Sequence, residues 1–319
     1  METLELFVPG CIGTCWYGKY HYMEPWAGCA HDCPYCYARF RSPVKNSVKN
    51  LGASFNGPRP LFPEAELLDR IEKEANSGKI NILKLCRFTD MFTPEFVENG
   101  LAFKVLSVLV KSKVKRIIIT TKGLPDAKLL GLIAANPEKF SYNAAVRPSA
   151  INKNNPLSVF DRALKPLDLR LEAAAAAVKT GALTTIHLDP FVAGYDDDDA
   201  VIRPFLEKLK KLGLNRVMFS YLLLSDEMAS ELEPALPPGV FGKLKALYDA
   251  GAKRQYLPNQ EETLYWALKP EIKRASVEKT ADLLMSMGFE FVLCSLKNTP
   301  GLDTVKYKNV TLCNGKFYA

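Results

Sequence analysis

Residues 80–121 read INILKLCRFTDMFTPEFVENGLAFKVLSVLVKSKVKRIIITT and contain the unit that predicts the fold. Two short apolar runs, at 80–88 and 114–121, lie on either side of a stretch, 94–112, whose apolar residues recur at helical spacing. Parallel strands need a long crossover between them, and a helix is the usual one. The order of strand, helix and strand therefore predicts a parallel βαβ unit.

The same rhythm continues on both sides of this unit. Further helices are expected at 63–78, 125–137, 168–181 and 200–213, and further strands at 21–26, 139–146, 182–190 and 214–224. The strand segments are nearly continuous apolar runs, which is typical of a parallel sheet covered by helices. We therefore predict an α/β fold, a partial (β/α)6 TIM-like barrel over residues 1–238, with residues 239–319 as a C-terminal extension packed on it.

The charge pattern allows several kinds of substrate. Lys and Arg total 42 against 35 Asp and Glu, and the resulting charge of +7 is scattered along the chain. Such an excess permits an anionic substrate such as a nucleotide or nucleic acid, and it also fits an ordinary solvated basic surface. The interleaved aromatic and basic residues that grip single strands are not evident.

The sequence also bears on the compartment. No apolar run approaches the roughly 20 residues of a membrane helix, and METLELFVPG lacks the order of a secretory signal. We therefore expect a cytoplasmic protein with no membrane partner. Cysteines are kept reduced there, so the eight in this chain indicate metal binding or redox chemistry rather than disulfides.

Three cysteines lie close together after the first predicted strand. GCAHDCPYCYAR, residues 28–39, contains Cys29, Cys33 and Cys36. A structural zinc site needs four ligands, usually as two spaced pairs, and no second CxxC pair exists in the sequence. Three thiolates suit an iron-sulfur cubane that leaves one iron open. An iron-sulfur cluster is therefore the leading interpretation and zinc the alternative.

This motif also carries a resemblance to a known family. CxxxCxxC after the first strand of a βα barrel resembles the hallmark of the radical S-adenosylmethionine (radical SAM) superfamily, and GCAHDCPYCYAR resembles the form in its spore photoproduct lyase-like subgroup. FTDMFTPE, IIITTKG, DLRLEAAAAAVKTG and HLDPFVAGYDD resemble later segments of that subgroup in the same order. RPSA (147–150) and the early position of Glu95 depart from the pattern, so the subgroup is implied but the repair reaction is not.

The resemblance implies a cofactor and a reaction. Cys29, Cys33 and Cys36 would bind an oxygen-sensitive [4Fe-4S] cluster whose open iron chelates S-adenosyl-L-methionine. An electron from a partner such as flavodoxin or ferredoxin would cleave this molecule to methionine and a 5′-deoxyadenosyl radical, which abstracts hydrogen from a substrate. The resemblance and the basic charge favour a nucleic acid or nucleotide over a small molecule or peptide as that substrate.

Several other residues are candidates for the site. Tyr35 would contact the adenine or shield the cluster. Thr89 and Asp90 would bind the methionine amino group, with Asp90 as a helix N-cap the alternative. Arg147, Ser149 and Glu172 would bind the ribose hydroxyls or the methionine carboxylate, or are ordinary rim and helix residues.

Two residues on the predicted strands have alternative readings. Cys86 precedes Asp90 by four residues and is expected on the same side of the strand. It would donate a hydrogen atom to a product radical, as a cysteine does in photoproduct lyase, or fill the core. His187 would bind cofactor or substrate at the rim, or be a satisfied core histidine. The run Asp196 to Asp199 is expected to cap and solvate the next helix.

The remaining cysteines leave two questions open. Cys11, Cys15, Cys294 and Cys313 would bind an auxiliary cluster if the fold brings the termini together, or are free buried thiols. A non-enzymatic iron-sulfur or zinc protein, serving electron transfer or structure, is the alternative function. The predicted barrel argues against that alternative, because an electron carrier needs no pocket.

Overall fold

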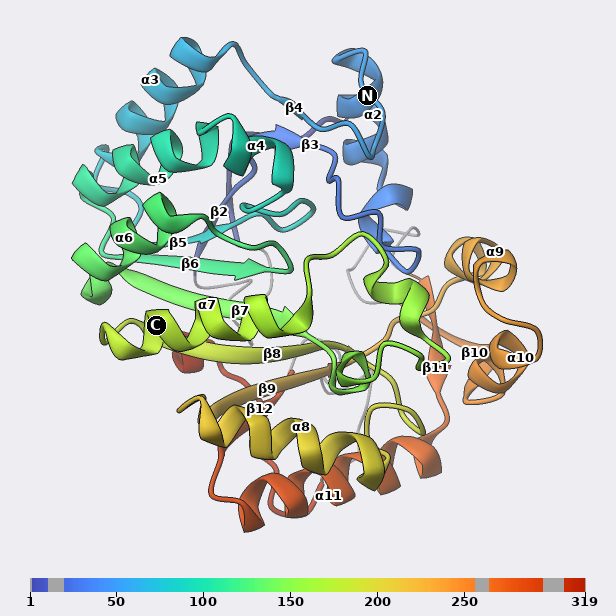
Figure 1. Ribbon diagram of the computed structural model, residues 1–319. Coiled ribbons are helices and arrows are strands. Elements are labelled where there is room, and N and C mark those ends of the chain that lie inside the picture. The colour runs from blue at the N-terminus through green and yellow to red at the C-terminus, as the bar shows by residue number, and fades with distance from the viewer. Residues whose placement is uncertain (1, 11–19, 256–263, 295–306, 319) are drawn as a thin grey trace.

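The computed structural model describes residues 2–10, 20–255, 264–294 and 307–318. Its centre is one sheet of eight strands, in the spatial order β1, β2, β5, β6, β7, β8, β9, β12 (Figure 1). The strands are β1 (Phe7–Pro9), β2 (His21–Met23), β5 (Ile82–Leu85), β6 (Arg116–Thr121), β7 (Phe140–Val146), β8 (Leu183–Phe191), β9 (Arg216–Tyr221) and β12 (Glu290–Leu293). Neighbouring strands are parallel except β1 and β2, which are antiparallel.

Helices cover the outer side of this curved sheet (Figure 1). They are α3 (Glu64–Ala75), α4 (Pro94–Glu98), α5 (Leu101–Lys111), α6 (Ala127–Ala135), α7 (Leu167–Lys179), α8 (Asp199–Lys211) and α11 (Pro270–Ser286). Among the described residues the edge strands β1 and β12 do not pair with each other, so the predicted partial barrel is confirmed. The helix expected at 94–112 is divided into α4 and α5, because Gly100 has a left-handed φ of 79°.

The two faces of the sheet differ in polarity. The outward residues are apolar and pack under the helices, for example Leu83, Ile117 and Phe219. Strand pairing places Lys84 beside Tyr22 and Ile118, and His187 beside Met218 and Ala145, on the opposite, concave face. Side chains alternate along a strand, so one parity supplies the core and the other lines the inside of the barrel. The inside is therefore buried but partly polar.

The C-terminal extension does more than pack on the outside. Its strand β12 joins the sheet next to β9, with Val292 opposite Met218. Its hairpin of β10 (Tyr248–Gln255) and β11 (Leu264–Leu268) lies with α9 (Asp226–Ala235) and α10 (Val240–Lys245) at one side of the barrel (Figure 1). Residues of these elements share a second hydrophobic cluster with Cys33 and Tyr35. The extension thus contributes to the wall around the cysteine loop.

Short elements complete the chain. They are β3 (Trp26–Ala27), β4 (Arg59–Pro60), α2 (Ser42–Asn50) and the 3-10 turns η1 (Tyr37–Phe40), η2 (Pro137–Lys139), η3 (Pro148–Ile151), η4 (Ser158–Asp161) and η7 (Lys316–Tyr318). Trp26 and Ala27 pair antiparallel with Pro60 and Arg59. This small ribbon leads directly into the cysteine loop.

The described end of the chain closes the floor of the barrel, where the strands begin. The Tyr20 hydroxyl, just before β2, donates to the Gly315 carbonyl at 2.9 Å. Arg216, the first residue of β9, donates to the Phe317 carbonyl at 2.8 Å and stacks on the Phe317 ring. Phe317 and Tyr318 are buried in a cluster with Ile118 and Met218 from the concave face. Residues 315–318 therefore plug the lower end of the barrel.

The acidic run before α8 is only partly the solvated cap that we expected. Asp198 is the N-cap, and its carboxylate accepts from the Ala200 amide at 2.9 Å. Asp196 and Asp197 are instead buried: Asp196 accepts from Ser149, and Asp197 accepts from Ser276 and the Gly194 amide. Two of the four carboxylates thus hold loops in place rather than face water.

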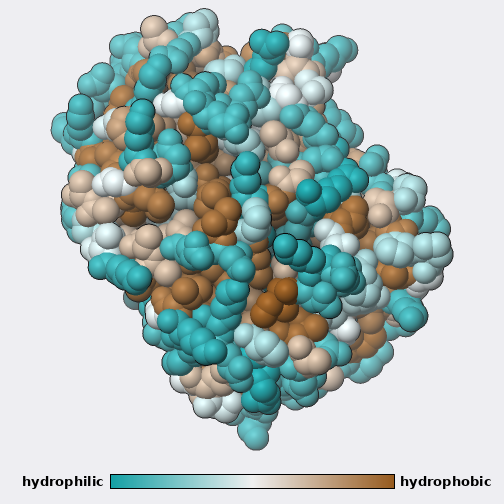
Figure 2. Space-filling view, in the orientation of Figure 1, coloured by the Kyte–Doolittle hydropathy of each residue, from teal (hydrophilic) through white to brown (hydrophobic). Residues whose placement is uncertain are grey.

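In the view of Figure 2, groups of apolar side chains lie among polar ones. Within the described ranges, none of the helices has both the length and the apolar character needed to cross a bilayer.

The floor plug should contribute measurably to stability. Replacing Phe317 by Ala removes a buried ring from the cluster, and we expect a loss of about 3 kcal/mol in the free energy of unfolding. Leu312→Ala is the control, because Leu312 is exposed and should lose well under 1 kcal/mol. Urea unfolding of the two variants measures both values, and similar losses would show that the plug does not support the barrel.

Candidate functional site

The cysteine loop leaves the barrel at a glycine that cannot be replaced. Gly28 has a φ of +87°, and a Cβ there would lie 2.6 Å from the Phe55 carbonyl oxygen. The next amide, of Cys29, donates to that same oxygen at 2.7 Å. Only glycine combines this backbone conformation with so close an approach. The Gly-Cys pair at the start of the motif is therefore required by the turn.

Asp32 fixes the middle of the loop. Its φ is +46°, a conformation that Asp tolerates better than most residues. Its carboxylate accepts from Arg39, from Asn56 at 2.8 Å and from Arg162. These donors hold the pKa of Asp32 below its usual value although burial acts in the opposite direction. The loop is thus tied to two other segments of the chain, at Asn56 and Arg162, and to its own last residue.

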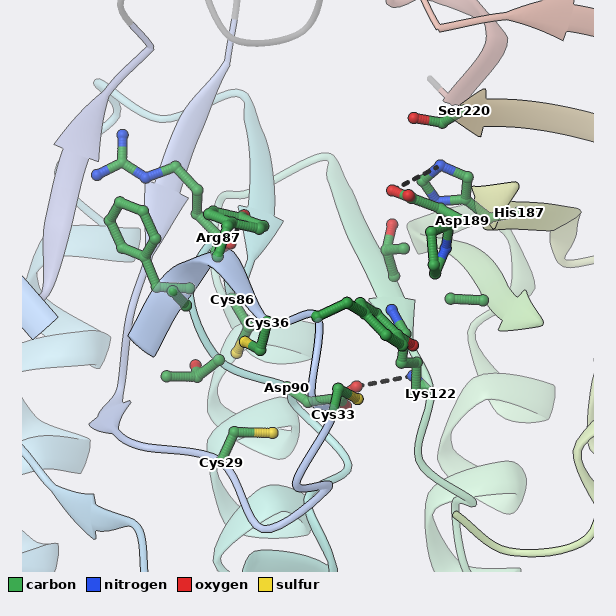
Figure 3. Close-up of a pocket in the computed structure, with 18 of the residues that line it drawn as sticks. Cys29, Cys33, Cys36, Cys86, Arg87, Asp90, Lys122, His187, Asp189 and Ser220 are labelled. Carbon is green, nitrogen blue, oxygen red and sulfur yellow. Dashed lines mark hydrogen bonds and ion pairs between the residues drawn. The ribbon is translucent and has the colours of Figure 1, made fainter. Parts of the chain in front are cut away.

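All three cysteines of the motif line one cavity of about 250 Å³ at the carboxyl ends of the strands. Figure 3 shows their side chains along the loop, with Cys86 and Asp90 beside them. Within the described residues no three His, Cys, Asp or Glu side chains are grouped closely enough to hold a single metal ion. A cubane does not require such a group, because each of its thiolates binds a different iron.

Burial makes free thiolates unfavourable in this cavity. It raises the pKa of Cys33 to about 11 and also raises the pKa values of Cys29 and Cys36. Asp90 and the other thiols raise the pKa of Cys29 further. Three thiolates can therefore lie together here only with a compensating positive charge. Iron supplies such a charge, so this donor set fits an iron-sulfur cluster.

Asp90 connects the cysteine loop to the ends of two strands. Its carboxylate accepts from Thr121 Oγ1 at 2.5 Å, from the Lys122 amide at 2.7 Å and from the Phe92 amide at 2.8 Å, and it lies 3.3 Å from His31 Nε2. Burial opposes ionisation, but His31 and these donors lower the pKa of Asp90 to about 2. The carboxylate is ionised and saturated with partners.

The N-cap alternative for Asp90 is wrong. Thr93 is the residue that precedes α4 in the N-cap position. Thr93 also accepts from the Ala30 amide at 3.1 Å, and this is a second tie to the cysteine loop.

Glu24 is a site residue that sequence reasoning missed. It follows β2, is almost completely buried, and accepts from the Arg87 amide, from the Phe88 amide at 3.0 Å and from Thr89 Oγ1 at 3.1 Å. Burial raises the pKa of Glu24 to about 6 despite these donors and Arg87. Thr89 does line the cavity, but its hydroxyl donates to Glu24.

Cys86 lines the cavity at the end of β5, as the strand parity predicts. Its φ is +60°, a left-handed conformation that is unusual for a residue with a side chain. Backbone strain of this kind is often found at functional sites. The Cys86 amide donates to the Met23 carbonyl at 2.9 Å, which fixes the turn.

Tyr35 also lines the cavity. Its ring packs on Phe160 with 4.6 Å between centroids, and Lys122 Nζ lies 5.8 Å from the ring centre. Burial opposes the charge of Lys122, but Cys33 and Asp189 outweigh it and raise the pKa of Lys122. The Lys122 ammonium therefore lies near Tyr35 and interacts with the thiols of the cysteine loop.

Three predicted cofactor ligands are not at the cavity. Glu172 lies on α7 with an exposed side chain, and its prediction is wrong because the helix turns it to solvent. Arg147 and Ser149 are buried but do not line the cavity. Arg147 donates to Asp161 and Ser149, and Ser149 donates to Asp196. This network holds the loop after β7. It engages the guanidinium of Arg147 and the hydroxyl of Ser149, which were expected to bind the cofactor.

The opposite wall of the cavity carries polar residues from β8 and β9. His187, Asp189 and Ser220 face the cysteine loop across the cavity in Figure 3. His187 Nε2 lies 3.8 Å from Asp189 Oδ2. His187 therefore lines the cavity, and its binding of cofactor or substrate stays a prediction. Asp189 and Ser220 were missed, although both stand on predicted strands with the parity that points inward.

Lys84 is the least expected residue of the cavity. It lines the cavity from β5 and is 2% exposed. Burial lowers its pKa to about 7, even though Cys86, Asp90 and Glu24 act in the opposite direction. A single lysine in an apolar run such as INILKL gives no sign of function in the sequence. The alternation of side chains along the strand could nevertheless have shown that Lys84 points inward.

The structure describes two of the four cysteines that were considered for an auxiliary cluster. Cys294 and Cys313 are buried in the same cluster of the barrel floor, and Cys294 also borders the cavity. Cys11 and Cys15 lie outside the described residues. An auxiliary cluster therefore stays a prediction.

The buried lysine predicts a pH dependence of stability. Because the pKa of Lys84 falls from 10.5 to about 7 on folding, the folded protein binds fewer protons between these values, and stability rises with pH across that window. Between pH 7 and 9.5 the free energy of unfolding of the wild type should rise by a few kcal/mol relative to that of Lys84→Met, at up to about 1.4 kcal/mol per pH unit. Urea unfolding measures both free energies. If the difference in free energy of unfolding between the two proteins does not change with pH, Lys84 stays charged in the folded protein.

The chain is similar to known proteins in its fold, whereas the comparisons of its sequence find no match. Neither a family profile nor a curated protein sequence matches the chain. Among solved structures, spore photoproduct lyase complexed with dinucleoside spore photoproduct superposes with a TM-score of 0.59 at 13% identity, over 84% of this chain and 74% of that one. A mutant of the same enzyme gives a TM-score of 0.58 at 13% identity over the same shares. Streptococcus suis SuiB bound to S-adenosylmethionine gives 0.49 at 13% identity, over 90% and 53%.

At this level of identity the comparison establishes the fold. The chain therefore has the fold of spore photoproduct lyase, a partial α/β barrel.

Proposed function

We propose that the chain is a radical SAM enzyme in which Cys29, Cys33 and Cys36 bind a [4Fe-4S] cluster with S-adenosyl-L-methionine on its open iron. One observation supports this most: the three cysteines lie on one loop at the carboxyl-end rim and face a cavity inside a fold of this kind. In βα barrels that rim is where chemistry takes place.

The bound cofactor would supply an electron that cleaves S-adenosyl-L-methionine to methionine and a 5′-deoxyadenosyl radical able to take hydrogen from a substrate. The chain's own residues would bind and orient. Asp90 and Thr93 fix the cysteine loop relative to β5 and β6, and Tyr35 covers one side of the cavity for the adenine. Glu24 holds the turn that presents Cys86 and Thr89.

The proposal includes a reducing partner. A small one-electron donor such as flavodoxin or ferredoxin would deliver the electron to the cluster. The basic charge of the chain makes a nucleotide or nucleic acid one candidate substrate. The residues that line the cavity also bear on the identity of the substrate.

The cysteine motif can be tested through metal content. Cys33→Ala should hold little iron after anaerobic reconstitution and release no 5′-deoxyadenosine with dithionite and S-adenosylmethionine, because a cubane with two protein ligands is weakly held. The control is Val292→Ala, which shortens a buried side chain that does not line the cavity. Iron analysis and chromatography give the two readouts. A colourless wild type that binds zinc would contradict the assignment.

Cys86 can be tested as the hydrogen donor. A thiol exchanges its hydrogen with solvent, so turnover in deuterated water should place deuterium in the product, and Cys86→Ala should lose most of this label. Cys294→Ala is the control, because Cys294 also borders the cavity but at the far end of the sheet. Mass spectrometry of the product measures the label, and equal labelling in Cys86→Ala and wild type would refute the role.

A further inference from the structure

Two buried thiols outside the cysteine motif belong to one hydrophobic cluster. Cys294 directly follows β12, and Cys313 lies in the segment that leads to the floor plug of residues 315–318. They are 8% and 3% exposed and are not joined in the structure. The proposed function uses neither of them. Their arrangement nevertheless points to a use of their own.

Backbone pairing places the two residues at neighbouring positions. Leu293 and Leu312 form a parallel β-bridge, in which the Leu293 amide donates to the Thr311 carbonyl at 3.0 Å. The Cys313 amide donates in turn to the Leu293 carbonyl at 2.8 Å. Cys294 and Cys313 each follow one residue of this bridge, so they face each other across the same pair of chains. Paired strands lie about 4.8 Å apart, and a disulfide needs Cα atoms about 4.4 to 6.8 Å apart.

Both side chains also point to the same side of the sheet. Leu293 is buried in the main core under the helices, and successive residues of a strand point to opposite faces, so Cys294 faces the concave side. It lines the cavity there. Cys313 lies in one hydrophobic cluster with Cys294 and with Met218, a residue of the concave face. The two thiols therefore have the backbone spacing and the side-chain direction that a disulfide requires.

Only one of the two thiols borders the cavity. Cys294 lines it, whereas Cys313 does not and is almost completely buried. A cavity of about 250 Å³ admits a molecule as small as hydrogen peroxide. An oxidant in the cavity would therefore meet Cys294 first and find Cys313 beside it. A thiol that an oxidant can reach, next to a second thiol that resolves the product, is typical of reversible redox-sensitive cysteines.

We propose that Cys294 and Cys313 form a reversible redox site whose oxidant is a small peroxide. With hydrogen peroxide, the Cys294 sulfur takes one oxygen to form a sulfenic acid, the O–O bond breaks and one water leaves. The Cys313 sulfur then displaces that oxygen, an S–S bond forms and a second water leaves. In all, the two thiols lose two electrons and two protons, and the peroxide accepts them. A dithiol reductant reverses the reaction.

The cross-link would connect the sheet to the floor plug. In the reduced protein the segment before the plug is held by the bridge at Leu312 and by the packing of Phe317 and Tyr318 in the cluster. A disulfide at Cys313 adds a covalent tie to β12 and limits the conformations of the unfolded chain, so it should stabilise the fold. This site goes beyond the proposed function and needs no iron-sulfur cluster.

Peptide mapping tests the cross-link directly. The full chain, reduced and then freed of reductant, is treated with hydrogen peroxide, alkylated and digested with trypsin. Mass spectrometry should find a peptide that joins Cys294 to Cys313 as the main cross-link of either residue, and dithiothreitol should remove it. Cys86→Ala is the matched control, because it removes another buried thiol of the cavity and should leave this cross-link unchanged.

Thermal stability gives a second readout. Peroxide treatment should raise the unfolding midpoint of the wild type by about 5 °C more than that of Cys313→Ala, because only the wild type gains the cross-link. The motif cysteines are oxidised in both proteins, so their effect cancels. Equal shifts in the two proteins would contradict the tie to the sheet. If Cys313→Ala does not fold, Cys294→Ser and Cys313→Ser, which keep the side chain close to the size of cysteine, give the same comparison.

Three further results would overturn the redox site. One is the absence of a peptide joining Cys294 to Cys313 after peroxide treatment, and another is a main cross-link from either residue to Cys11 or Cys15. The third is iron bound beyond one cubane after anaerobic reconstitution and lost in Cys313→Ala, which would assign the pair to an auxiliary cluster. Failure of the proposed function is distinguishable from these results, because Cys33→Ala, which lacks a motif ligand, should form the same cross-link as the wild type.

Discussion

The buried carboxylate of Asp90 is the interaction on which the site depends most. It accepts from the backbone and side chains at the ends of β5 and β6 and lies against His31 in the middle of the cysteine motif. A loop of irregular backbone would otherwise have many accessible conformations, and ordering it costs entropy. An ionised, fully hydrogen-bonded carboxylate in a low-dielectric environment gives back enough free energy to hold one of them. The cysteines are thereby positioned before any cofactor binds.

Glu24 does for the next loop what Asp90 does for the cysteine loop. It follows β2 and satisfies the amides of the turn after β5, where Cys86 has its left-handed conformation. The two carboxylates stand on neighbouring segments, so the rim is ordered by charge-assisted hydrogen bonds rather than by apolar packing. Apolar packing is instead concentrated outside the sheet, under the helices, and below the cavity, at the floor plug. This division leaves the inside of the barrel free for polar side chains.

The C-terminal extension completes both ends of the cavity. The hairpin and helices α9 and α10 share a hydrophobic cluster with Tyr35 and Cys33, while residues 315–318 close the floor. A parallel sheet that does not close on itself would otherwise expose its concave face to water. Because the extension covers that face, Lys84 and Ser220 are buried.

The sequence by itself determined the alternation of strands and helices, the partial barrel and the position of the cysteine motif at its rim, because these depend on local periodicity and on spacing along the chain. It also placed Cys86 inward through strand parity and His187 at a strand end near the rim. It could not show that Arg147 and Ser149 are used up by Asp161 and Asp196, or that Glu172 points to solvent. Nor could it identify Lys84 and Ser220 as cavity residues, or Glu24 as the residue that holds the turn after β5. Those facts depend on which side chains meet across strands that are far apart in the sequence, and only the tertiary structure decides that.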